Sequence, residues 1–287
     1  MPKHFLNIPV IYRLVTRWIG YLPTPLSYAI SQHIADLSYV LYGSAVKNVK
    51  QNLRLVFPYL PDKTLSRLAR KLFRNYSKYI VDCGRFTNFN KKTITEQIGH
   101  YEGKENLDKV FHMNKGLILL TAHLGNWELG GMFFGSYGFK INVLTLPDEN
   151  PEIDTIRSRY RSVYGVKTIT VGNTPFSMLE MAKALDHKEI IAMLIDRYHT
   201  GLDSIATDFF HKSTLFPRGP FVLSRLTGAP IIVAFVVKEK DVYKGIIEKP
   251  LIVTHEDEEC ATLKKVVKIF EKYIMLYPDQ WYNFTPT

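Results

Sequence analysis

The chain has 287 residues, of which 46% are hydrophobic and 13% aromatic, so it can bury a sizeable core and is not a disordered protein. Its formal net charge of +10 lies in residues 1–81, which contain twelve Lys and Arg but only two acidic residues. After residue 81, basic and acidic residues are equal in number. Such a basic block predicts a phosphate-bearing partner, either an anionic membrane surface or nucleic acid. Because no nucleic-acid motif accompanies the block, we expect no nucleic-acid partner.

The cysteines and the N-terminal residues indicate the compartment. Cys83 and Cys260 are far apart and match no redox or metal spacing, which favours a reducing compartment. The first residues lack the succession of basic start, apolar run and cleavage site that marks a secretory signal peptide.

The first predicted elements are two apolar, aromatic-rich helices, residues 8–22 and 24–43, separated by Pro23-Thr24-Pro25. Basic and bulky apolar residues alternate in the first helix, which favours an anionic lipid surface, where each docked Lys or Arg contributes roughly 1 kcal/mol. Asp36 lies near the middle of the second helix and would be costly inside a bilayer, so we expect both helices to lie on the membrane. A span from Leu26 to Tyr42, packing of both helices on the core, and a solvated basic face stay open as alternatives.

The rest of the chain has the pattern of an α/β domain. Residues 62–81 predict an amphipathic helix with Asp62 as its N-cap, an apolar stripe and a basic face. Candidate strands lie at 116–122, 140–146, 167–171, 189–195, 230–237 and 242–247, and candidate helices at 128–137, 151–164, 175–186, 218–228 and 258–276. This alternation predicts a three-layer α/β fold, with a mostly parallel central sheet flanked by helices, over residues 46–287, and residues 1–45 are expected to form the membrane-associating helices.

The run His123-Leu124-Gly125-Asn126-Trp127-Glu128 joins a candidate strand to a candidate helix. A His and a carboxylate on either side of such a turn can meet, and general-base activation of a hydroxyl requires an imidazole together with an acid that fixes its tautomer. The ordinary alternative is a structural hydrogen bond. Asp196 also follows directly after a candidate strand, so His123 and Asp196 are expected at the same edge of the sheet.

Further residues are candidates for binding the reacting groups. The backbone N–H groups of Gly125 and Asn126, at a helix start, are candidate donors to an oxyanion, although Asn126 and Trp127 can equally just shape the turn. Arg218 is a candidate phosphate contact or an ordinary turn residue. The segment 196–211 is rich in His and Asp but fits no zinc spacing, so we expect no metal site. No Gly-x-Ser-x-Gly run marks a serine nucleophile.

These motifs resemble those of the lysophospholipid acyltransferase superfamily, above all its bacterial lipid A late acyltransferases (the lauroyl- and myristoyl-transferring enzymes) and their mycobacterial glycolipid-acylating relatives. The pattern His-x4-Glu is similar to the catalytic motif of that superfamily. Further stretches resemble family elements in the same order: Asn52 to Pro58 the "NL…FP" element, Leu194 to Arg197 the "D-Q/R" strand end, Asp208 to Phe210 the "FFG" hairpin, and Pro278 to Phe284 the "P-x-Q-W/Y" element. The resemblance runs from about residue 45 to the last residue.

The resemblance implies transfer of a fatty acyl group from a thioester, acyl carrier protein or acyl-CoA, to a hydroxyl of a lipid or glycolipid, with no cofactor. It places the protein at the cytoplasmic face of the bacterial inner membrane, as a peripheral protein or with a single N-terminal anchor. His123 would take the proton of the acceptor hydroxyl. Glu128 or Asp196 would orient the ring, because in some relatives the acid at the strand end partners the His.

The resemblance also makes Arg159 or Arg161 a candidate contact for a phosphate or the thioester, since the family has an Arg in this region. Arg157, Arg159 and Arg161 cannot all face one way at i,i+2 spacing. Two features depart from the lipid A members: His211 replaces the hairpin Gly, and no "RR" follows the PxQ element. We therefore infer the acyl-transfer class without a specific acceptor. A hydrolase that uses the same dyad and a non-catalytic lipid-binding protein stay open as alternatives.

Overall fold

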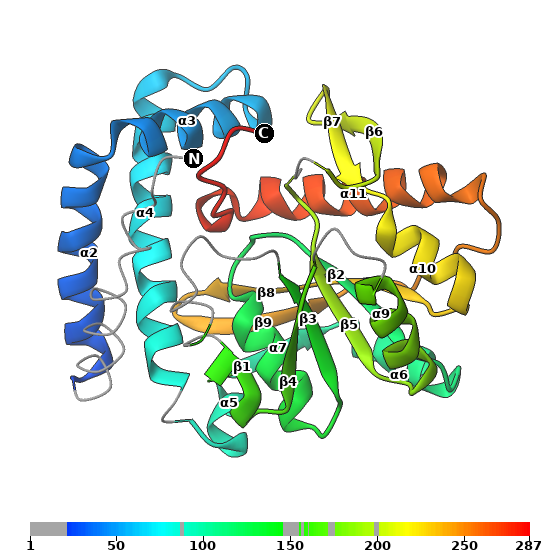
Figure 1. Cartoon of the computed structure of the whole chain (residues 1–287). Coiled ribbons are helices and arrows are strands. Elements are labelled where there is room, and N and C mark those ends of the chain that lie inside the picture. Colours follow the sequence, from blue (N-terminus) through cyan, green and yellow to red (C-terminus); the bar gives the residue numbers. More distant parts are fainter. Residues whose placement is uncertain are drawn as a thin grey trace.

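The computed structural model describes residues 22–86, 89–145, 155, 158–159, 161–171, 176–197 and 201–287 (Figure 1). The helices are α2 (Thr24–Leu41), α3 (Gly43–Val56), α4 (Asp62–Arg85), α5 (Lys91–Gln97), α6 (Lys104–His112), α7 (Trp127–Ser136), α9 (Phe176–Asp186), α10 (Gly219–Thr227), α11 (Glu258–Leu276) and the 3-10 helix η3 (Pro278–Gln280). The strands are β1 (Ile98–Glu102), β2 (Leu117–Thr121), β3 (Ile141–Thr145), β4 (Val166–Thr170), β5 (Ile190–Leu194), β6 (Ser204–Phe209), β7 (Lys212–Pro217), β8 (Ile231–Glu239) and β9 (Val242–Ile247).

Two of the predicted helices fall on residues that are not described. The helix expected at 8–22 lies outside the described residues except for its last position, and the one expected at 151–164 is described only in part. Within the latter, residues 155, 158–159 and 161–163 are helical.

The candidate strands lie in one seven-stranded sheet of order β1-β9-β8-β2-β5-β3-β4. Neighbouring strands are parallel except for β8 and β9, which form an antiparallel hairpin. β2 lies between β5 and β8, and its five residues are all buried, as expected for a strand covered on both faces. The prediction of a mostly parallel central sheet is confirmed, and the C-terminal end of β2 lies in the middle of the edge where the parallel strands end.

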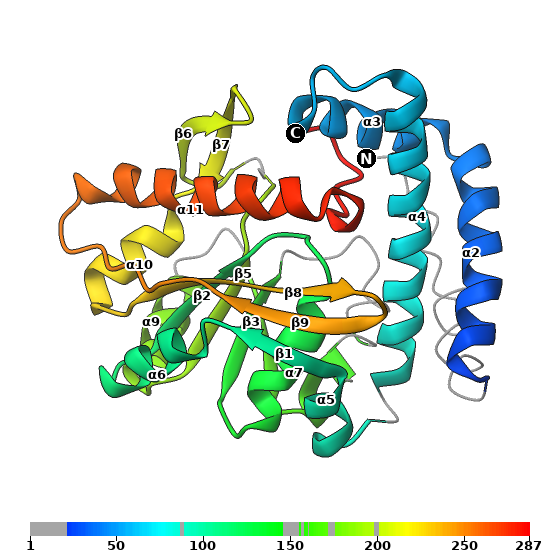
Figure 2. The same cartoon turned by 180° about the vertical axis from the view of Figure 1, so that it is seen from behind.

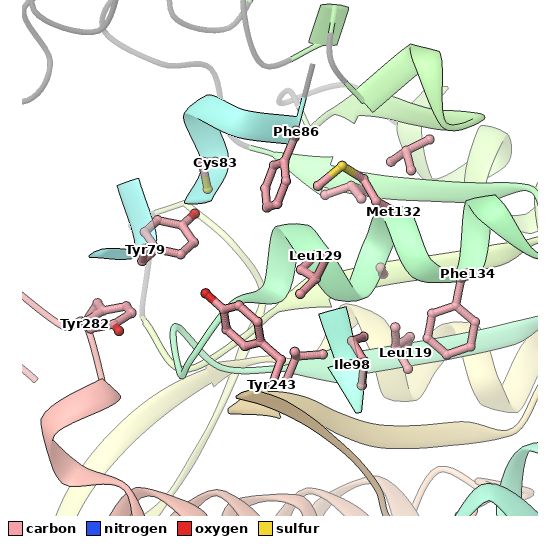
Figure 3. Packing of buried hydrophobic residues seen from close by; sticks show 14 of the residues in the cluster. Tyr79, Cys83, Phe86, Ile98, Leu119, Leu129, Met132, Phe134, Tyr243 and Tyr282 are labelled. Carbon is pink, nitrogen blue, oxygen red and sulfur yellow. The ribbon is translucent and has the colours of Figure 1, made fainter. Parts of the chain in front are cut away.

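Helices cover both faces of this sheet. Successive side chains of β2 point to opposite faces: Leu117 and Leu119 belong to a core with α4, α5, α6 and α7, whereas Ile118 and Leu120 belong to a core with α9, α10 and α11. Figure 2 shows α11 on one side of the sheet and α5, α6 and α7 on the other. Figure 3 shows part of the first core, where side chains of α4 face those of α7. The three-layer arrangement follows from this alternation.

Helix α2, which corresponds to the helix predicted at residues 24–43, packs beside α4 and makes its main contacts with it (Figures 1 and 2). Asp36 of α2 faces α4, where it pairs with Arg70 at 2.8 Å and Arg74 at 2.6 Å. Asp36, whose charge is unfavourable in a membrane span, therefore forms ion pairs between α2 and α4. Among the described residues, no helix combines the length and hydropathy that crossing a bilayer requires.

The start of α4 differs in one detail from the sequence prediction. Pro61 occupies the N-cap position and Asp62 is the first helical residue, with no side-chain hydrogen bond to the helix end. The carboxylate of Asp62 pairs with Arg54 of α3 instead. As an acid in the first turn, Asp62 still interacts favourably with the helix dipole.

Candidate active site

The loop that follows β2 is held in place by the neighbouring strand β8. Gly125 forms a parallel bridge with Val236, and the N–H of Asn126 donates to the Val236 carbonyl at 2.7 Å. Gly125 has φ +67°, and a Cβ at this position would lie 2.0 Å from the Val236 oxygen. Only glycine fits such a positive φ and so close a backbone approach, which explains the Gly within the His-x4-Glu run.

The strand register brings His123 and Asp196 together. Thr121 and Leu194 are paired at the ends of the parallel strands β2 and β5, and His123 and Asp196 each follow two residues later. His123 Nδ1 lies 2.7 Å from Asp196 Oδ1. The carboxylate of Asp196 is fully buried, whereas the His123 side chain is 20% exposed. The imidazole packs edge-on against the ring of Trp127, with centroids 5.1 Å apart.

The Asp196 carboxyl is held in its charged form. Burial by itself would raise its pKa, but the His123 ring, the Arg197 guanidinium and a hydrogen bond from Trp281 together lower the pKa of Asp196 below its usual value. Because an ionised carboxylate only accepts hydrogen bonds, the proton between the two groups belongs to His123 Nδ1. This assignment makes Nε2 the acceptor nitrogen of the neutral ring.

Glu128, the other candidate acid, makes a buried ion pair with Arg161. Arg161 Nε and Nη2 donate to the two Glu128 oxygens at 3.0 and 2.5 Å, and both side chains are at most 7% exposed. Arg161 Nη1 also donates to Thr168 on β4 at 3.3 Å. Such a bidentate pair fixes the first turn of α7 against the segment that precedes β4. Of the two acids considered for His123, the one hydrogen-bonded to Nδ1 is thus Asp196.

The structure does not support the backbone of Gly125 and Asn126 as oxyanion donors. The Gly125 N–H donates to the Gln280 carbonyl at 3.0 Å, and the Asn126 N–H donates to the Val236 carbonyl. Neither N–H group is therefore available to an oxyanion. The Asn126 side chain caps α7 by accepting from Leu129 N at 3.0 Å. These groups shape the turn, which was the alternative reading of the sequence.

A buried polar network that the sequence did not indicate continues from Asn126. Its amide nitrogen donates to the Tyr243 hydroxyl at 3.0 Å, and that hydroxyl donates to Asp82 of α4. Asp82 also accepts from Tyr28 of α2 at 2.5 Å and from Lys238 of β8 at 3.1 Å. Burial, followed by the nearby charge of Asp82, raises the pKa of Tyr243 well above its usual value. This network ties the candidate catalytic loop to the helices that precede the sheet.

The remaining arginine candidates lie in different surroundings. Arg159 is exposed on the same helical segment as the buried Arg161, in keeping with their i,i+2 spacing, and Arg157 lies outside the described residues. Arg218 pairs with Glu259 and Glu256, each at 2.6 Å, and with a third acid, Asp203, at 3.6 Å. These carboxylates raise the pKa of Arg218 and satisfy its guanidinium, so the structure favours the turn residue over a phosphate contact.

The element Pro278 to Phe284 supplies a residue of the site whose role the sequence did not reveal. Trp281 is 1% exposed, and its Nε1 donates to Asp196 Oδ2 at 2.9 Å. The Gln280 side chain exchanges two hydrogen bonds of 2.8 Å with the backbone of Lys238 on β8. The signal in the sequence was the PxQW pattern itself. Among the described residues, no three His, Cys, Asp or Glu are grouped as a metal site.

Comparison with known proteins gives a match over almost the whole chain. The family described as bacterial lipid A biosynthesis acyltransferase matches residues 1–286. The chain is 26% identical to the lipid A biosynthesis lauroyltransferase of Escherichia coli K12, over 96% of this chain and 88% of the relative. It is 23% identical to the lipid A biosynthesis palmitoleoyltransferase of the same strain, over 92% and 85% of the two chains. It is 22% identical to a phosphatidylinositol mannoside acyltransferase of Mycobacterium tuberculosis, over 84% and 76%.

Proposed function

The chain belongs to the bacterial lipid A biosynthesis acyltransferase family, and we propose that it transfers a fatty acyl group from a thioester donor to a hydroxyl of a lipid or glycolipid. In this proposal His123 is the general base. The names of its relatives mention lipid A biosynthesis and phosphatidylinositol mannoside, so we take a lipid or glycolipid as the class of the acceptor. Acyl carrier protein and CoA are the two candidate donors, and an acidic carrier protein would complement the basic residues 1–81.

The observation that carries the proposal is the hydrogen bond between His123 Nδ1 and Asp196 Oδ1 at the C-terminal edge of the parallel strands. As the acceptor oxygen attacks the thioester carbonyl, His123 Nε2 takes the hydroxyl proton and the ring becomes an imidazolium. The buried Asp196 carboxylate stabilises this charge. Collapse of the tetrahedral intermediate forms the ester and breaks the C–S bond, and the thiolate takes the proton from Nε2. The substrate oxygen acts as the nucleophile, so no acyl-enzyme is required.

Glu128 and Arg161 enter the proposal as a positioning pair. Their bidentate contact holds the first turn of α7, which begins four residues after His123. Because the pair is buried, its disruption is expected to cost about 3–5 kcal/mol. Arg159, which is exposed on the neighbouring helical segment, is the arginine we retain as a candidate contact for a substrate phosphate.

We also propose that the protein works at the cytoplasmic face of the bacterial inner membrane, with α2 lying on the bilayer. One face of α2 packs on α4, and the opposite face exposes large apolar side chains with accessibilities of 44–77%. These side chains are Leu26, Ile30, Ile34, Leu37, Val40 and Leu41. An apolar stripe beside a basic region is typical of an interfacial helix. Replacing Leu37 and Val40 by Glu is expected to reduce sedimentation with anionic phospholipid vesicles; undiminished binding would contradict this placement.

The reaction is tested with purified protein, acyl carrier protein and CoA thioesters, and lipid extracts as acceptors, with the product identified by mass spectrometry. We expect donor consumption to require the acceptor, and His123→Ala to lower the rate by about three orders of magnitude or more. His187→Ala, which alters an exposed histidine in a turn after α9, is the matched control. Consumption without acceptor would indicate the hydrolase, and an active His123→Ala variant would indicate that the histidine is only structural.

A further inference from the structure

Residues 280–282 pair with the His123 loop through backbone hydrogen bonds on either side of an isolated β-bridge. The Tyr282 N–H donates to the His123 carbonyl at 2.7 Å, and the Gly125 N–H donates to the Gln280 carbonyl at 3.0 Å. Between these two bonds, Leu124 and Trp281 form an antiparallel bridge. The backbone from the His123 carbonyl to the Gly125 N–H, directly after the imidazole, is therefore fixed by a segment that lies far along the chain.

The indole of Trp281 is locked in one orientation by the β6–β7 hairpin. Phe209 packs edge-on against it with ring centroids 5.9 Å apart, and Phe210 lies at 6.3 Å. The N–H of Phe210 donates to Glu271 of α11 at 2.7 Å, which fastens the hairpin to the helix layer. A fully buried indole with aromatic neighbours has no room to turn, so its N–H keeps its direction toward Asp196.

The two oxygens of Asp196 are thereby assigned to different donors. Trp281 Nε1 occupies Oδ2 at 2.9 Å, and His123 Nδ1 occupies Oδ1 at 2.7 Å. An indole N–H can only donate and a carboxylate can only accept, so this contact has a single polarity. It holds the plane of the carboxylate and stabilises its negative charge in a buried site.

We propose that Trp281 is a positioning residue for acyl transfer: its N–H fixes the orientation of the Asp196 carboxylate that keeps the ring proton of His123 on Nδ1. The inference rests on the proposed function, because it assigns a purpose to the surroundings of the general base. It gives the PxQW element and the Asp-Phe-Phe hairpin a common role. The first supplies the donor and the second holds the donor still.

The proposal is tested with Trp281→Phe, which removes the N–H donor and part of the ring. Phe270→Leu is the matched control, because Phe270 is a fully buried aromatic of the same core and its loss leaves the partners of Asp196 in place. The downfield proton resonance of the Nδ1–H···Oδ1 bond, assigned by its loss in His123→Ala, reports on the geometry without any turnover. Steady-state kinetics then separates kcat from KM.

Both variants are expected to melt at lower temperature than the wild type, but Trp281→Phe alone should shift or lose the downfield proton. Its kcat should fall about tenfold or more, as expected for loss of a hydrogen bond to a charged group, while KM stays within about twofold. Should Trp281→Phe not fold, 3-benzothienylalanine at position 281 replaces the N–H by sulfur and keeps the ring shape. The same changes in proton resonance and kcat are expected.

The outcomes separate this inference from the proposed function. An unchanged proton resonance together with an unchanged kcat in the Trp281 variants overturns the positioning role and leaves the proposed function intact. Equal loss of kcat in Phe270→Leu also overturns it, because the effect would then come from packing. Full activity of His123→Ala overturns the proposed function, and with it the catalytic purpose of the arrangement.

Discussion

Asp196→Asn is the substitution whose effect depends most directly on the hydrogen bonds around His123. An asparagine has one acceptor oxygen and one donor NH2 group in place of two acceptor oxygens, and it must face both Trp281 Nε1 and His123 Nδ1. Because the indole can only donate, the amide oxygen turns toward Trp281 and the NH2 group toward His123. The ring proton then moves to Nε2, the nitrogen that has to accept the hydroxyl proton.

The size of the effect follows from the cost of the opposite amide orientation. That orientation places two donors 2.9 Å apart at Trp281, and each buried group left unpaired costs about 1–3 kcal/mol. The two unpaired donors together cost about 2–6 kcal/mol. At about 1.4 kcal/mol per factor of ten, the productive tautomer falls to a few per cent or less. The charge that stabilised the imidazolium is lost as well. The corresponding change in a Ser-His-Asp triad lowers kcat by about 10⁴, and we expect a similar loss here.

The assay compares acyl transfer by Asp196→Asn, Trp281→Phe and the double variant. Without the indole donor, the amide introduced at position 196 of the double variant is able to present its oxygen to His123 Nδ1. We therefore expect the double variant to be about tenfold or more faster than Asp196→Asn, which is the opposite of the further loss that independent sites would show. If the double variant is slower than Asp196→Asn by the factor that Trp281→Phe costs in the wild type, the tautomer argument is refuted.

Three further predictions concern stability. Gly125→Ala should lower the melting temperature strongly and abolish activity, because its Cβ would lie 2.0 Å from the Val236 oxygen at a φ of +67°; normal folding would refute this. Arg161→Gln should destabilise the fold by about 3–5 kcal/mol because it breaks a buried ion pair with Glu128, and Glu128→Gln added to it should restore part of the loss; denaturant unfolding of single and double variants measures this coupling. Because the pKa of Asp196 is lower in the folded than in the unfolded chain, its charge contributes stability above about pH 4 that is lost on acidification, so Asp196→Asn should flatten the acid side of the stability–pH curve.

The parallel part of the sheet could be predicted because buried strands are continuous apolar runs with helical patterns between them. Among the elements that were not predicted, α5 and β1 are short and sparsely buried. α5 has seven residues with one buried, and β1 has one buried residue in five. β1 is an edge strand beside β9 and has few buried positions, so its sequence carries no periodic signal. The structure of α5 and β1 is decided by tertiary contacts instead of by local pattern.

The site was predictable to the extent that it depends on strand ends. His123 and Asp196 follow neighbouring parallel strands, and the register of β2 and β5 places them opposite each other. The partner of Glu128 could not be predicted, because Arg161 comes from a segment whose position depends on the whole helix layer. Sequence spacing shows that His123 and Glu128 can meet across one turn. It does not show that Glu128 binds a residue of another element, Arg161, instead.

The stretches that resemble family motifs are far apart in the sequence, and the structure gives a physical reason for their occurring together. Asn52 of the NL…FP element donates to the carbonyls of Asn283 and Thr285 at 3.0 and 2.8 Å, and so anchors the segment that carries Trp281. Trp281 in turn binds Asp196, which binds His123. Each contact is a single-polarity hydrogen bond between buried or half-buried groups, so a change in one motif alters the surroundings of the next. His123 at the end of β2 is thus linked to the strand end with Asp196, to the PxQW element and to the NL…FP element.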